Sequence, residues 1–228
     1  TRQITGVAAG TQDTDAVNVA QLKALNTKVD KGAVHYFSVK STEKGENSNR
    51  DNDGATGEDA VAIGVGAQAK GGASTALGLG VIAEKDSSTA VGCSAYAQGE
   101  FSTALGYKAN AQGNFSMALG QEAQALEVSS TALGSGAKAL LDGSVALGFG
   151  SIASIGKGVF GYDPFTGKAS IENSAVWKAT HAALSVGSTV DGNNLITRQI
   201  TGVAAGTQDT DAVNVAQLKA LNKKVDGK

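Results

Sequence analysis

The chain has 228 residues, with 31 glycines, one proline, one tryptophan and aromatic side chains at only 5% of positions. So few aromatic residues exclude a thick aromatic core, and the composition favours a fibrous scaffold over an enzyme. The formal net charge of −2 has both signs mixed, so there is no basic patch for nucleic acid and no polybasic membrane segment. Without a long apolar run, a signal peptide or a lipidation motif, we expect a soluble piece of a longer protein.

The first segment, residues 1–30, predicts an extended stretch followed by a short helix. Glycines punctuate residues 3–10, and Asp13, Thr14 and Asp15 then offer N-cap chemistry for the helix. Leu22, Leu25 and Val29 are spaced by three and four residues, which is one step of a coiled-coil seam. Because a helix this short is marginal alone, we expect its seam to pack against other copies of the chain.

The central segment, residues 60–156, is a run of 14-residue repeats. Each repeat glycine is preceded two positions earlier by alanine, and in six of seven cases a serine lies four positions earlier. A fixed period of this kind indicates stacked copies of one small unit, and the alternation of small and large side chains predicts strands. At about 3.3 Å per residue, one repeat makes two strands of about five residues and two corners, or one turn of a β-solenoid. The repeat glycines are Gly64, Gly78, Gly92, Gly106, Gly120, Gly134 and Gly148.

The alternation assigns side chains to two faces. Serine and alanine are small enough for the narrow lumen of such a coil, and the later alanine pairs, such as Ala67 and Ala69, Ala109 and Ala111, and Ala123 and Ala125, should also lie there. The larger side chains then form one apolar stripe, which we call the aliphatic column and interpret as a subunit interface. The alternative is a monomer that buries this stripe in its own lumen. The aliphatic column contains Ile63, Leu77, Val91, Leu105, Leu119, Leu133 and Leu147.

Between the lumen alanines of the second strand lies a variable position whose side chain should point outward. We name these residues the outer column and consider them a possible ligand-binding face; the alternative is a merely solvated sheet. Cys93, at a variable corner, is interpreted as a passive thiol that has no partner for an internal disulfide. The outer column contains Gln68, Ile82, Tyr96, Asn110, Gln124, Lys138 and Ile152.

No catalytic, cofactor or metal site is predicted. His35 and His181 lack partners at metal-ligand spacing, and we expect His181 to pack beside Trp177 in a structural role. Residues 51–54 resemble the start of a calcium loop, but Ala62 stands where the bidentate glutamate is required, so a solvated turn is the better interpretation. An acyltransferase built on hexapeptide repeats would need a period of six or eighteen, which the 14-residue spacing does not provide.

The last segment repeats the first, because residues 197–222 are identical to residues 1–26. A second seam of Leu218, Leu221 and Val225 is therefore expected. Two identical segments on either side of a solenoid are stronger support for a coiled coil than one heptad alone.

These features resemble trimeric autotransporter adhesins of Gram-negative bacteria. The Ser-x-Ala-(Leu/Ile/Val)-Gly repeats are similar to the YadA-like head, and residues 4–22 and 200–218 look like its neck motif. The resemblance implies a mainly β fold, a trimeric left-handed parallel β-roll flanked by necks that lead into short coiled-coil helices. The implied domains are a neck at 1–30, a lead-in to the head at 31–59, the β-roll head at 60–156, a head-insert motif at 157–196 and a second neck at 197–228.

The resemblance also implies a function. The chain would be an extracellular adhesin head module of a homotrimeric fibre on the bacterial surface, with an outer-membrane anchor that is absent from this sequence. It would attach to host cells or to matrix proteins such as collagen, fibronectin or laminin through the outer face of the roll. The aliphatic column would line the trimer axis. Two residues before several members of this column, threonine or methionine stands where valine is common in the family. The alternative is a structural spacer without its own ligand.

Overall fold

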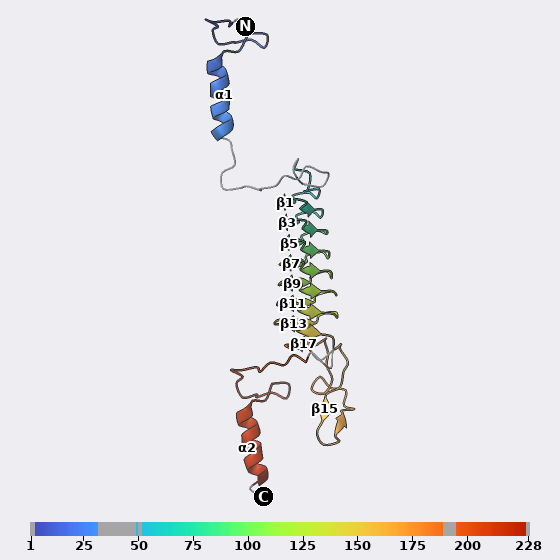
Figure 1. Ribbon diagram of the computed structural model, residues 1–228. Helices are drawn as coiled ribbons and strands as arrows, with labels where there is room; N and C mark the ends of the chain where they lie inside the picture. The colour runs from blue at the N-terminus through green and yellow to red at the C-terminus, as the bar shows by residue number, and fades with distance from the viewer. Residues whose placement is uncertain (1–2, 32–48, 50–51, 189–194, 227–228) are drawn as a thin grey trace. The chain divides into compact units, whose positions relative to one another are not determined.

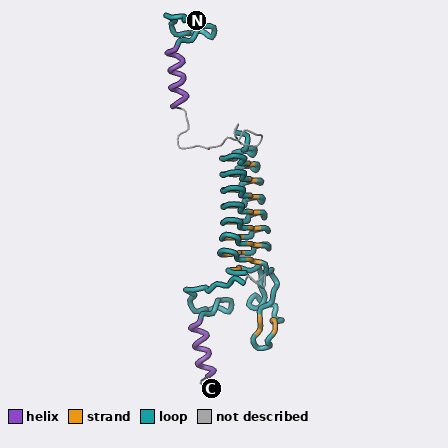
Figure 2. Tube along the Cα trace, viewed as in Figure 1, coloured by secondary structure: helices purple, strands orange, loops and turns teal. Residues whose placement is uncertain are grey.

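The computed structural model describes residues 3–31, 49, 52–188 and 195–226. The chain divides into two compact units, Thr1–Lys40 and Ser41–Lys228. The first contains helix α1 (Val19–Lys31), and the second contains the repeats, a hairpin and helix α2 (Val215–Asp226). Figure 1 labels these elements, and Figure 2 shows the repeats as stacked coils.

Each repeat forms one coil with a three-residue strand and a two-residue strand. The three-residue strands are β1 (Val61–Ile63), β3 (Thr75–Leu77), β5 (Thr89–Val91), β7 (Thr103–Leu105), β9 (Met117–Leu119), β11 (Thr131–Leu133) and β13 (Val145–Leu147). The two-residue strands are β2 (Gln68–Ala69), β4 (Ile82–Ala83), β6 (Tyr96–Ala97), β8 (Asn110–Ala111), β10 (Gln124–Ala125), β12 (Lys138–Ala139) and β14 (Ile152–Ala153).

The strands are shorter than the predicted five residues because the corners take up more of each coil. Both corners contain a residue with positive φ, for example Phe101 at 55° and Lys108 at 54° on either side of β7. Such a left-handed residue interrupts the extended backbone, so the strand ends there.

The coils stack as two parallel sheets in which every residue pairs with its equivalent one repeat away. Leu77 of β3, for example, lies opposite Val91 of β5. The order β1-β3-β5-β7-β9-β11-β13-β17 makes an eight-stranded sheet, and the order β14-β12-β10-β8-β6-β4-β2 makes a seven-stranded sheet. The predicted parallel solenoid of 14-residue coils is therefore confirmed.

The lumen between the sheets is filled by alanine and serine, as predicted. Its alanines are fully buried, and the serines of the column, from Ser74 to Ser144, are at most 1% exposed. Ser102 Oγ donates a hydrogen bond to the corner carbonyl of Gly99 at 2.6 Å. In the described residues, the buried hydroxyls of Ser74 and Ser116 have no such partner.

The repeat glycines form a ladder that no other residue fits. Gly106 has φ +134°, and a Cβ built on it would lie 2.6 Å from the carbonyl oxygen of Gly120 in the next coil. Both the backbone conformation and the close approach of the next coil thus require glycine.

An eighth rung comes from beyond the repeats. The chain leaves the roll after β14, forms an antiparallel hairpin of β15 (Tyr162–Asp163) and β16 (Lys168–Ala169), and returns as β17 (Leu184–Ser185), which pairs with β13. Leu184-Ser185-Val186-Gly187 thereby takes the place of a further repeat, and Ile152 N–H donates to Gly187 O at 2.7 Å. The excursion is an insertion within a coil.

The helix N-cap predicted at residues 13–15 is wrong. Helix α1 begins four residues later than Asp15, and Asn18 is its cap, because Asn18 Oδ1 accepts from Gln21 N–H at 3.1 Å while Gln21 Oε1 accepts from Asn18 N–H at 3.2 Å. This reciprocal pair is a capping box, and Asn214 and Gln217 repeat it before α2. Asp15 instead closes the preceding turn, accepting from the N–H groups of Thr11 and Gln12.

Candidate interaction surfaces

The aliphatic column lies on the outer side of the eight-stranded sheet. Leu77, Leu105, Leu133 and Leu147 are 41–47% exposed, and Ile63, Val91 and Leu119 are half-buried. The alanines on the same strands point into the lumen and are fully buried, except Ala62 in the first coil, which is half-buried. The alternative of a monomer with this stripe in its lumen is therefore overturned, since alanine and serine occupy that space.

The same face carries a second column, two residues earlier on each strand. Val61 and Met117 are 46% and 41% exposed, while the threonines and Val145 at the same position of the other strands are half-buried. Parallel register stacks like on like, as with Thr75 opposite Thr89. The outer side of this sheet is thus continuously apolar apart from threonine hydroxyls.

The outer column lies on the other side of the roll, on the seven-stranded sheet. Its seven side chains are half-buried and lie one above another in parallel register. Residues two positions further along each strand also contact them: Tyr96 Oη donates to Glu84 Oε2 at 3.4 Å, and Gln98 Nε2 donates to Asn110 Oδ1 at 2.8 Å. Burial, and then the Glu84 charge, raises the pKa of Tyr96.

Sequence reasoning missed this second set of outward side chains. Lys70 and Glu84 belong to it and form an ion pair at 3.1 Å. The signal was available, because the period of two along a strand puts both positions on the same face. The outward surface of the seven-stranded sheet is therefore two residues wide and mostly polar, with Ile82, Leu126, Leu140 and Ile152 as its aliphatic members.

The two copies of the duplicated segment form the same local structure. In each, one glutamine holds a glycine from the preceding loop: Gln21 accepts from Gly10 N–H and donates to Gly10 O, both at 3.0 Å, and Gln217 binds Gly206 in the same way at 3.1 and 3.0 Å. The predicted seams stay uncovered, with Leu22, Leu25 and Val29 between 57% and 63% exposed and Leu218, Leu221 and Val225 between 58% and 62% exposed.

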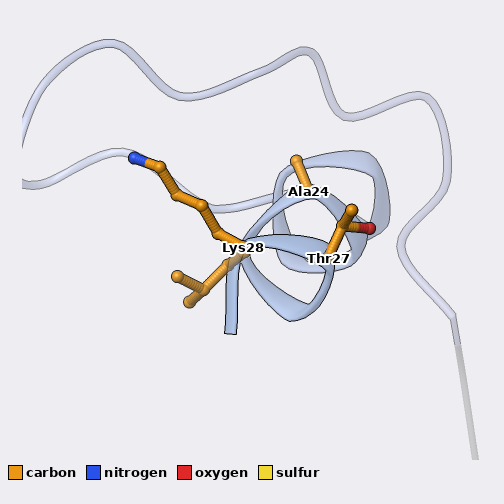
Figure 3. Close-up of a pocket in the computed structure, with 4 residues that line it drawn as sticks. Ala24, Thr27 and Lys28 are labelled. Atoms are coloured by element: carbon orange, nitrogen blue, oxygen red, sulfur yellow. The ribbon is translucent and has the colours of Figure 1, made fainter. Parts of the chain in front are cut away.

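A shallow hollow runs along α1, lined by Ala24, Leu25, Thr27 and Lys28. In Figure 3 the labelled side chains, Ala24, Thr27 and Lys28, point away from the helix rather than toward one another. This arrangement is that of an open helix face, and it lacks the convergent polar groups of a small-molecule site.

Arg198, in the second copy of the duplicated segment, binds the last coils of the roll. Its guanidinium donates to Phe149 O at 2.6 Å, to Ser151 Oγ at 3.0 Å and to Val186 O. Sequence analysis missed this role because Arg198 belongs to the duplicated segment, and nothing in the segment indicates contact with the roll.

Outside these surfaces, the remaining candidates carry no site. His181 is exposed and pairs only with the neighbouring Thr180 hydroxyl at 3.1 Å, so its predicted packed role is wrong. Cys93 is a half-buried free thiol.

The described residues contain no group of three or more His, Cys, Asp or Glu placed to hold a metal ion. None of the described helices has the length and apolarity needed to cross a membrane. His35, Asp51 and residues 36–41 of the lead-in fall outside the described part of the chain.

Comparison with known families matches the geometry. The coiled stalk of trimeric autotransporter adhesins matches residues 3–45 and 199–228. The YadA head domain repeat matches 55–80, 83–109, 97–123, 111–136 and 125–151. The chain belongs to the trimeric autotransporter adhesins. Its stalk matches fall on the two helical segments and its head matches fall on the coils, whereas residues 152–198, which include the hairpin and β17, lie outside both matches.

Individual relatives are similar over part of the chain. Autotransporter adhesin BadA of Bartonella henselae is 56% identical over 71 residues, 31% of this chain, and trimeric autotransporter adhesin AtaA of Acinetobacter sp. (strain Tol 5) is 46% identical over 77 residues, 33% of it. Each match spans only 2% of the relative's length.

Two solved structures are also similar. The collagen-binding domain of Yersinia adhesin YadA is 28% identical, with a TM-score of 0.44 over 73% of this chain and 98% of that one. The C-terminal YadA-like domain of BPSL2063 from Burkholderia pseudomallei is 19% identical, with a TM-score of 0.24 over 100% of this chain and 88% of that one.

Proposed function

We propose that this chain is an extracellular head module of a bacterial surface fibre, which assembles from three copies and attaches to host matrix proteins or host cells. Family membership supports an adhesive role, and the two faces of the roll suit different tasks, one for subunit contact and the other for ligand binding. The observation that carries the proposal is the contrast between them: the eight-stranded sheet presents an apolar face, whereas the outward side chains of the seven-stranded sheet are mostly polar.

The apolar face suits an interface between identical chains. Burying a large aliphatic side chain contributes about 1.5–3 kcal/mol, so covering the exposed part of each residue in the aliphatic column contributes about 1 kcal/mol. Over all rungs this amounts to about 7 kcal/mol per chain before the cost of association. Three rolls that turn this face to a common axis would keep the aliphatic column dry, with the threonine methyl groups packed beside it.

The two exposed helical seams fit the same assembly. Leu22, Leu25 and Val29, and the matching residues of α2, would pack against their counterparts in the other chains to begin stalk segments. The implied domain boundaries follow, with necks at 1–30 and 197–228 on either side of the head at 60–156 and the head insert at 157–196.

In such a fibre the outer column faces the surroundings. Gln68, Tyr96, Asn110, Gln124 and Lys138 then form a ladder of polar and aromatic groups on which an extended ligand could lie. In the full-length protein an outer-membrane anchor would hold the fibre at the cell surface. The proposal includes no catalytic activity and no cofactor, because the family is one of adhesins.

Solid-phase binding of the purified chain to immobilised collagen, fibronectin and laminin tests the proposal. A triple variant, Tyr96→Ala with Asn110→Ala and Gln124→Ala, should weaken saturable binding at least tenfold. A matched triple on the hairpin and the loop that follows it, Phe165→Ala with Lys168→Ala and Ile171→Ala, should leave binding unchanged. Equal binding by both variants would remove the outer column as the ligand face.

A structural spacer is the second candidate. The identical segments 1–26 and 197–222 favour it, because a module bracketed by the same neck can be inserted in tandem without a ligand of its own. A spacer would show no saturable binding to any of the three matrix proteins or to host cells, yet would still form a stable three-chain particle.

A further inference from the structure

Two rows of corners flank the eight-stranded sheet, one before its strands and one after them, and both rows carry large exposed side chains. Before β7 and β9, Phe101 and Phe115 occupy left-handed corners with φ of 55° and 58°. A bulky residue in this conformation costs about 1–3 kcal/mol and is uncommon. The two rings nevertheless lie 55% and 59% exposed, stacked with centroids 5.3 Å apart and planes 2° apart. We call this side the leading edge.

The other side, which we call the trailing edge, follows each strand of the same sheet. Tyr107, directly after the glycine that ends β7, is 45% exposed, and Lys108 Nζ lies 5.1 Å from the centroid of its ring. Leu79 and Phe149 occupy equivalent positions in other coils and are 57% and 69% exposed. Both edges are continuous with the apolar face between them, so an interface on that face would extend onto them.

Charge distinguishes the two edges at the level of β7. Glu100 stands beside Phe101 on the leading edge, and Lys108 stands beside Tyr107 on the trailing edge. In the part of the chain that the structure describes, the one ion pair joins Lys70 to Glu84. Among the described residues, neither Glu100 nor Lys108 belongs to an ion pair, although the charge of Glu122, one coil further on, also acts on Lys108. The two groups thus have complementary charges and stand next to aromatic rings that are about half exposed.

Rotational symmetry brings these edges together. When three parallel copies turn the same sheet toward a common axis, the leading edge of each copy meets the trailing edge of the next at the same rung. We propose that the protomers lock edge to edge, with Glu100 and Phe101 of each copy seated on Tyr107 and Lys108 of its neighbour. This inference rests on the three-chain assembly proposed above and adds which side chains close it.

The chain's own cysteine allows a direct test. Ser87 is the leading-edge residue before β5, and Cys93 is the trailing-edge residue after it. Within one chain the whole of β5 separates them, more than the roughly 7 Å between Cα atoms that a disulfide allows. Between neighbouring copies the proposal places them side by side. Ser87→Cys, oxidised under mild conditions in the intact protein, should therefore give a three-chain band on a non-reducing denaturing gel.

Ser129→Cys is the matched control, because it also lies on the leading edge but three coils away, about 14 Å from the level of Cys93. It should give at least tenfold less three-chain product than Ser87→Cys. A three-chain particle in which neither variant cross-links, or in which both cross-link equally, would overturn the edge pairing while leaving the assembly intact. A single-chain particle would overturn both.

A charge reversal tests the pairing without cysteine chemistry. Lys108→Glu should weaken association, which raises the chain concentration at which half of the subunits are assembled. Adding Glu100→Lys should bring this concentration most of the way back. If the double variant associates no better than Lys108→Glu alone, the two residues do not meet across the interface.

Discussion

Replacing Gly106 by alanine tests the glycine ladder that sets the stacking of the coils. The new Cβ would stand 2.6 Å from Gly120 O and 2.7 Å from Gly120 C, whereas ordinary contact begins at 3.4 Å. Relieving this clash requires the two coils to move apart by several tenths of an ångström. That movement stretches the hydrogen bond from Gly120 N–H to Leu105 O, which is 2.8 Å long. With φ at +134°, the backbone strain is about 1–3 kcal/mol, and the weakened hydrogen bond adds about 1 kcal/mol.

We therefore expect Gly106→Ala to lower the free energy of unfolding by about 3 kcal/mol. Gly136→Ala is the control, since its φ is also positive, at +66°, but a Cβ there meets nothing within 4 Å. Lys108 and Glu122 occupy the same position in other coils, so the roll accepts a side chain there at about 1 kcal/mol. Circular dichroism during denaturant unfolding, at one fixed chain concentration, measures both variants. Equal losses would refute the close-approach argument.

Three further predictions concern single side chains. Ser116→Ala removes a buried hydroxyl without a partner in the described residues, so the free energy of unfolding should stay unchanged or rise. Ser102→Ala removes a hydrogen-bonded hydroxyl and should lower the free energy of unfolding by about 1 kcal/mol. Denaturant titration compares the two variants. Arg198→Met should cost about 1–3 kcal/mol and speed proteolysis at the roll–neck junction, because the carbonyls of the last coils lose their donor; unchanged proteolysis would contradict this. Hydrogen bonds from the N–H groups of Thr207 and Gln208 lower the pKa of Asp211. This turn should therefore keep its stability above about pH 4 and lose it as the pH falls through the lowered pKa. An NMR titration of Asp211 with a midpoint at or above the ordinary value near 3.9 would contradict this.

The repeats could be predicted from the sequence because one physical constraint recurs in every coil. The lumen accepts small side chains, mainly alanine and serine, so the alternation of small and large residues fixes which face of each strand points inward. Val81, fully buried among alanines, shows that the rule concerns available volume rather than residue type. The pattern leaves strand length open, because left-handed corners at residues as varied as Phe101 and Lys108 have no common sequence signal.

The remaining features depend on long-range contacts that no local pattern contains. The return of the chain as β17 follows an excursion of about 30 residues, and Ser185-Val186-Gly187 matches a repeat only weakly, so its place in the sheet emerged from the structure. Arg198 contacts Phe149 across a sequence separation of 49 residues. The capping box at Asn18 and Gln21 could have been found, but the acidic residues before it gave a stronger helix-start signal.

The mass of the purified chain in dilute solution tests the central claim most directly. Light scattering after size-exclusion chromatography should give three chains per particle, because none of the described residues covers the aliphatic column on the eight-stranded sheet or the two helical seams. A stable, folded particle of a single chain would contradict the assignment of that face as a subunit interface.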